Sequence, residues 1–107
     1  MTPSEAYELS LQESVNGIAY SSRMGNYGTL ERFHQIIDAI SLLQKELRGR
    51  TEVSRELFAA LFVLGNQIDG NVAGAIHKGL SVPDWVLGGG IASLNEALYA
   101  IFEDHNA

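Results

Sequence analysis

Cysteine is absent from this chain of 107 residues, and proline occurs only twice. The lack of cysteine excludes disulfides and thiolate chemistry. No low-complexity stretch is present, and a content of 46% hydrophobic and 19% charged residues is typical of a globular protein. A chain of this length forms one domain, so we expect residues 1–107 to share a single core.

Basic residues are scarce, with seven Lys and Arg against thirteen Asp and Glu and a formal net charge of −6. An acidic protein does not attract phosphate groups, which disfavours nucleic acid and anionic membranes as partners and leaves a basic protein partner open. Long apolar runs are also missing, because the longest covers only residues 57–64 and is too short to span a bilayer. The first residues lack the pattern of a signal peptide, so we expect a cytoplasmic protein.

Charge of either sign is scarce in the second half of the chain. Residues 1–56 contain 14 charged side chains, whereas residues 57–102 contain only four, at Asp69, Lys78, Asp84 and Glu96. A stretch so poor in charge is buried in its own core or held against another surface. A chain this short has little interior, so the pattern indicates a protein–protein interface.

Helical spacing dominates the first half. The start signal Thr2-Pro3-Ser4-Glu5 and an apolar stripe predict a helix over 3–24, in which Gly17 is an unfavourable residue. Thr29 can cap a second helix over 29–48, which carries the cleanest stripe in the chain. The first stripe comprises Tyr7, Leu11, Val15 and Ile18, and the second comprises Phe33, Ile36, Ile37, Ile40, Leu43 and Leu47.

The apolar positions from Leu57 to Ala75 hold their helical phase through the glycines between them, which favours one long helix over 52–78. The alternative is a pair of helices broken near Gly65 to Gly70. A last helix is expected over 91–103, after three consecutive glycines at 88–90 that are awkward inside a helix. These elements predict an all-α fold, an antiparallel bundle of four main helices, or five if the third one breaks.

Polar residues interrupt the third helix at Asn66 and Asp69, and His77 follows further along. Either they face solvent, or they form a buried hydrogen-bond network, or they are convergent groups of a ligand-binding or catalytic pocket. Gly70 and Gly74 form a GxxxG pattern that allows close helix approach, inside the bundle or across a dimer axis. The pattern of residues indicates no catalytic residue, metal site or cofactor, so an enzyme is the less favoured interpretation.

Residues 57–64 are apolar around the whole helix circumference, and such a helix must be covered on every side. Three neighbours in a small bundle leave part of it open, and a second copy of the chain would cover the rest. We therefore predict a homodimer, or at least an interaction surface, built on apolar and aromatic anchors. The predicted interface residues are Phe58, Leu61, Phe62, Trp85 and Phe102.

The sequence thus leads to three functional hypotheses. The first is a small acidic, non-enzymatic interaction module of the adaptor, immunity or regulatory type, working as a homodimer and able to bind another, basic, protein. The alternative is a ligand-binding or catalytic bundle with a pocket near Asn66, Asp69 and His77. The third is a structural component of a larger assembly.

Overall fold

Thr2 begins the first helix as its sequence predicts. In the computed structural model, which describes residues 1–105, helix α1 spans Pro3–Val15. The Thr2 hydroxyl accepts a hydrogen bond from the Glu5 backbone N–H at 3.1 Å, and Glu5 accepts one from the Thr2 backbone N–H at 2.9 Å. The bond from the Thr2 backbone lowers the pKa of Glu5, because it stabilises the carboxylate.

The expected single helix over 3–24 is wrong, because the chain bends at Asn16 and Gly17. Past the bend lie a short helix, α2 (Ile18–Ser21), and a 3₁₀ turn, η1 (Ser22–Met24). At the bend the Glu13 carboxylate accepts a hydrogen bond from the Ile18 backbone N–H at 2.8 Å. A Cβ atom on residue 17 would collide with the backbone and side chain of Glu13, so only glycine fits this turn.

The apolar stripe expected on the first helix is confirmed only in part, since Ile18 is buried and Tyr7 packs against the core. Val15 is 64% exposed, whereas the buried residues of α1 are small or polar. They are Ala6, Ser10, Glu13 and Ser14. The Ser10 and Ser14 hydroxyls donate to the backbone carbonyls of Ala6 and Ser10 at 2.9 and 2.7 Å, which satisfies these buried polar groups within the helix.

Helix α3 (Leu30–Leu47) confirms the second predicted helix. Thr29 caps it by accepting a hydrogen bond from the Arg32 backbone N–H at 3.1 Å. Its stripe forms a large part of the core, as predicted, through Phe33, Ile36, Ile40 and Leu43.

Helix α4 (Arg55–His77) is continuous, so the prediction of one long helix is confirmed and the alternative break near Gly65 to Gly70 is wrong. Ser54 caps it by accepting from the Leu57 backbone N–H at 3.1 Å. Helix α5 (Ile91–Glu103) confirms the last helix, and a wide π-type turn, η2 (Val86–Gly90), precedes it. Gly89 has a φ of 145° there, a backbone conformation that favours glycine and explains the glycine run.

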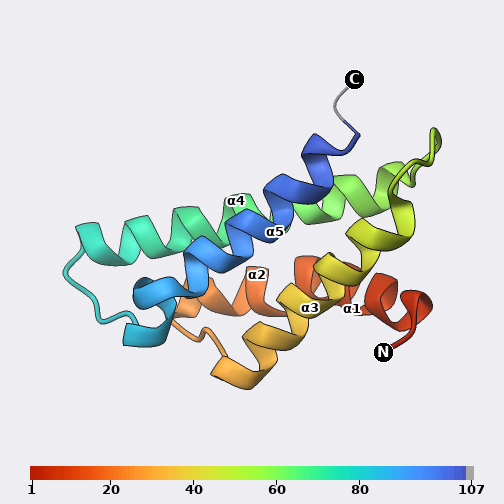
Figure 1. Cartoon of the computed structure of the whole chain (residues 1–107). Coiled ribbons are helices and arrows are strands. Elements are labelled where there is room, and N and C mark those ends of the chain that lie inside the picture. The colour runs from red at the N-terminus through yellow and green to blue at the C-terminus, as the bar shows by residue number, and fades with distance from the viewer. Residues whose placement is uncertain (106–107) are drawn as a thin grey trace.

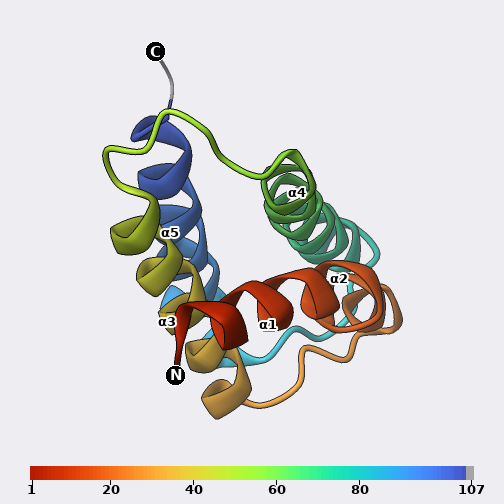
Figure 2. The ribbon, with the colours of Figure 1, turned by 90° about the vertical axis from the view of Figure 1, so that its right-hand side faces the viewer.

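The four longer helices form a ring in which α1 and α5 each pack against both α3 and α4 (Figures 1 and 2). Figure 2 shows α1 crossing from α3 to α4 along the lower edge of the ring. No helix among residues 1–105 is long and apolar enough to cross a membrane.

Neighbouring helices run antiparallel in only part of this ring. Glu13 near the end of α1 meets Arg32 near the start of α3, and Phe58 of α4 meets Phe102 of α5, so both pairs are antiparallel. In contrast, α3 and α5 are parallel, because Phe33 packs on Trp85 near their starts at a ring separation of 5.3 Å. Their ends meet as well, where Gln44 donates to Asp104 at 3.0 Å.

The pair α1 and α4 is parallel too, since Tyr7 hydrogen-bonds Ser54 at the beginning of both helices, with 3.0 Å between the hydroxyl oxygens. Parallel neighbours arise because α3 and α4, although consecutive in the chain, lie on opposite sides of the ring. The antiparallel bundle predicted from the sequence therefore holds for helices that follow one another along the chain, but not for every packed pair.

Gly65 lets α5 approach α4 closely. It is buried, and a Cβ atom there would stand 2.7 Å from Cδ1 of Leu98 on α5. Gly74 on the same helix has nothing within 4 Å of such an atom. The two glycines therefore differ in packing and share the same helical backbone.

We predict that Gly65→Val lowers the free energy of unfolding by about 1–3 kcal/mol, because the added atoms overpack the contact with Leu98. Gly74→Val is the matched control and should be neutral or slightly stabilising, since valine has the better helix propensity and the site is open. Urea denaturation followed by circular dichroism measures both. Equal losses in the two variants would contradict the close contact.

Candidate interaction surfaces

The structure brings together only part of the predicted polar pocket, because Asn66 and Asp69 line one hollow between α4 and α5 and His77 does not. Asn66, Asp69 and His77 are all exposed on α4, and His77 lies eleven residues beyond Asn66, about 16 Å along the helix axis. Asp69 accepts a hydrogen bond from the Asn95 side chain of α5 at 3.2 Å. Within residues 1–105, no group of three or more His, Asp or Glu side chains could hold a metal ion.

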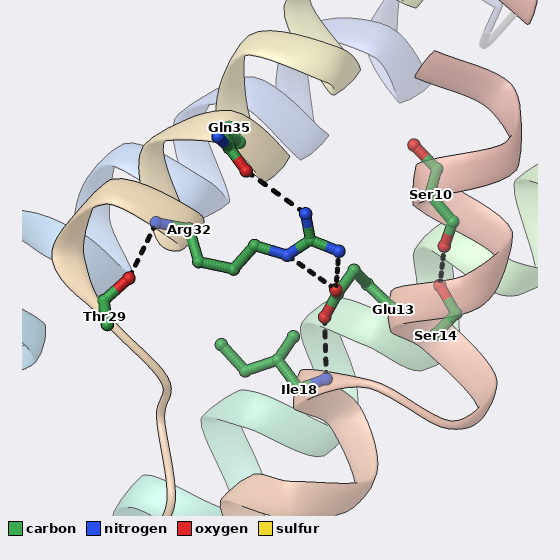
Figure 3. Close-up of polar contacts among 7 residues, drawn as sticks. All are labelled: Ser10, Glu13, Ser14, Ile18, Thr29, Arg32 and Gln35. Atoms are coloured by element: carbon green, nitrogen blue, oxygen red, sulfur yellow. Dashed lines mark hydrogen bonds and ion pairs between the residues drawn. The ribbon is translucent and has the colours of Figure 1, made fainter. Parts of the chain in front are cut away.

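The most buried carboxylate belongs to Glu13, whose side chain is 7% exposed (Figure 3). One oxygen accepts from Nε and Nη2 of Arg32 on α3 at 3.0 and 2.7 Å, and the other accepts from the Ile18 backbone N–H. Gln35 in turn accepts from Arg32 at 3.1 Å. Both oxygens are thus engaged, so Glu13 joins α1, α2 and α3 structurally and is poorly placed as a general base.

Sequence reasoning did not single out Glu13. The available signal was weak, a carboxylate four residues before a glycine that interrupts a helix. Its partner Arg32 lies nineteen residues away, and the ion pair forms only when α3 folds back along α1.

We predict that Glu13→Gln lowers the free energy of unfolding by about 1.5–3 kcal/mol, because charge-assisted hydrogen bonds to Arg32 and Ile18 are lost. Glu8→Gln on the exposed side of α1 is the control and should change stability by less than about 0.5 kcal/mol. Chemical denaturation of both variants at pH 7 tests this role. An equal loss of unfolding free energy in both variants would contradict the structural role of Glu13 in linking α1, α2 and α3.

Tyr27, in the loop before α3, places a polar group in the core. It is 2% exposed, and its hydroxyl has no hydrogen-bond partner among residues 1–105. Burial raises the pKa of Tyr27, because the phenolate would lose its hydration. The unfolded chain therefore ionises first, and stability should fall as the pH rises above about 10.

We predict that Tyr27→Phe leaves the protein as stable as the wild type or more stable, since it removes an unpaired buried hydroxyl at constant shape. It should also remove absorbance change from the high-pH end of a spectrophotometric tyrosine titration, because burial raises the pKa of Tyr27. A loss of stability above about 1 kcal/mol would show that the hydroxyl has a partner in solution.

An aromatic groove runs between α4 and α5. It consists of two adjoining hollows of 310 and 320 Å³ that share Tyr99 and Phe102. Phe58 lines the first hollow, and Phe62 and Leu98 line the second. Phe62 and Tyr99 are 65% and 67% exposed, which is unusual for aromatic side chains facing the same groove.

The structure brings together only part of the predicted interface. Phe58, Phe62 and Phe102 meet in the aromatic groove, with the rings of Phe58 and Phe102 packed edge to face at 5.6 Å. Leu61 is fully buried in the core of its own chain, because it points toward the centre of the ring of helices, so it presents no surface to a partner.

Trp85 is separated from the groove. It is half-buried against Phe33 of α3, near the start of α5, whereas Phe102 lies near the end of that helix. Tyr99 was missing from the predicted set. Its position three residues before Phe102, on the same face of a helix, was the signal that could have found it.

A second surface, which we call the outer seam, follows the solvent side of α4. It comprises six residues, all exposed, at alternating steps of four and three. They are Ala59, Val63, Asn66, Gly70, Ala73 and His77. A Cβ atom on Gly70 or Gly74 would meet nothing within 4 Å, so the GxxxG pattern does not serve a close contact inside this bundle.

Comparison of the chain with models of protein families, with curated proteins and with solved structures finds no match.

Proposed function

We propose that the chain is a small acidic, non-enzymatic protein–protein interaction module that works as a homodimer through the outer seam of α4. It would act in the cytoplasm, as an adaptor, immunity or regulatory protein, by binding another protein. The observation that carries the proposal is a helix with an apolar, nearly uncharged side left in solvent.

The spacing of the outer seam supports helix–helix pairing. Steps of four and three residues average 3.5, the repeat that keeps one side of a helix facing a partner. Ala59, Gly70 and Ala73 are small enough for two backbones to approach closely, and Val63 adds apolar area. Asn66 near the middle is a polar residue of the kind that sets register in paired helices.

The exposed area of the chain supports the same proposal. Its accessible surface is 6538 Å², whereas a compact monomer of 11.6 kDa exposes about 5,800 Å². The difference of about 700 Å² is close to the roughly 800 Å² that each partner buries in a stable protein–protein interface. Pairing along α4 would bring the exposed surface near the value expected for a compact particle.

We predict that sedimentation equilibrium of the wild type at micromolar concentration gives twice the mass of the 11.6 kDa chain. Ala73→Glu should shift the protein to a monomer, because it places a charge in the seam of both copies. Ser93→Glu on the exposed side of α5 is the matched control and should leave the dimer intact. Circular dichroism confirms that both variants remain helical.

A monomeric wild type across this concentration range would overturn the homodimer. A dimer equally insensitive to Ala73→Glu and Ser93→Glu would place the contact away from the outer seam.

A further inference from the structure

The aromatic groove lies beside the outer seam, with which it shares Asn66, and its dimensions suit a helix. Phe58 and Asp69 line its two ends on α4 and are eleven residues apart, about 16 Å along the axis. That length matches three turns of a partner helix, which presents anchors at positions i, i+3 or i+4, and i+7.

The floor of the groove is apolar and partly fixed. Phe58 and Phe102 hold each other edge to face at 5.6 Å, and Leu98 is buried beneath them against Gly65. Phe62 and Tyr99 remain exposed at its sides. Aromatic residues around a preformed hollow often contribute much of the binding energy of a protein interface.

The charges beside the groove are mostly acidic. Asp69 lines one hollow and Glu103 the other, and Glu96 is exposed on α5 one turn before Tyr99. Among residues 1–105, none of these three carboxylates forms an ion pair. Of the bases, His105 lines the first hollow just past the end of α5, Arg55 lies at the start of α4, and α5 itself contains no Lys or Arg.

These charges decide between possible occupants. Two copies placed groove to groove would bring Asp69, Glu96 and Glu103 against the same acids, which is unfavourable. A helix with Lys or Arg beside its apolar anchors would gain complementary charge and faster association. We infer that the aromatic groove binds an amphipathic, basic helical segment of another protein. The inference rests on the proposed role as an interaction module but does not require the homodimer.

The test uses the whole chain labelled with ¹⁵N and a panel of synthetic helical peptides of about 18 residues, long enough for the groove. Each peptide carries leucines at the i, i+3 or i+4, and i+7 positions with lysines beside them, and each has a twin with glutamates in place of the lysines. We expect the lysine peptides to shift amide resonances around Phe62, Tyr99 and Phe102. The glutamate twins should not bind, and raising the salt concentration should weaken the binding of the lysine peptides.

Charge reversal in the protein supplies the second arm. Glu96→Lys with Glu103→Lys should weaken lysine-peptide binding at least about tenfold, since two complementary charges become repulsive. Glu31→Lys with Asp38→Lys, on the exposed side of α3, is the matched control and should change affinity much less. If the groove double variant fails to fold, the salt dependence and the glutamate twins decide alone.

Binding of no lysine peptide in the panel, equal binding of the twins, or shifts confined to the outer seam would each overturn the inference. The monomeric Ala73→Glu variant separates it from the homodimer, because peptide binding should survive in that variant. Loss of the homodimer with retained peptide binding would refute only the self-association, and a dimer that binds no peptide would refute only the occupant of the groove.

Discussion

The structure depends on one constraint, a long helix that is poor in charge and keeps one side in solvent. α4 carries an apolar run around its whole circumference, yet α1, α2, η1 and α5 pack on only part of it. Leu57, Leu61 and Leu64 fill the core and leave the opposite side of the helix facing solvent. Phe62 and Val63 therefore remain exposed. The exposed apolar area follows from how the ring of helices is built.

The first helix adds little apolar surface to the core that it forms with α3 and α4. The buried face of α1 consists of alanine, two serines and Glu13, so it contributes little hydrophobic area. It is held instead by directional contacts, the Glu13–Arg32 ion pair and the Tyr7–Ser54 hydrogen bond. Such contacts fix position more than they add stability, since each is worth about 1–3 kcal/mol. α3, α4 and α5 consequently supply most of the apolar burial.

The sequence predicted the helices correctly where capping residues and apolar spacing determine them. The features that it did not predict depend on contacts between residues far apart in the chain. The capping residues Thr2 and Thr29 and the unbroken phase of α4 are local, and the structure confirms them. The bend at Gly17 depends on a carboxylate that also bonds α3, so spacing within the first helix could not reveal it. The order of helices around the ring is likewise a tertiary property. It decides that Trp85 lies apart from the aromatic groove and that Leu61 faces inward.

Both surfaces lie on the same helix, and this has a consequence for how they would act together. The outer seam and the aromatic groove meet at Phe62 and Asn66 but otherwise use different sides of α4. Pairing two copies along the seam would place one groove on each copy beside the shared contact. A dimer would then present two binding sites on a rigid frame, and a partner with two basic helices would gain from a high effective concentration. A weak single site would thereby suffice for tight binding, provided that the partner's helices can span the distance between the grooves.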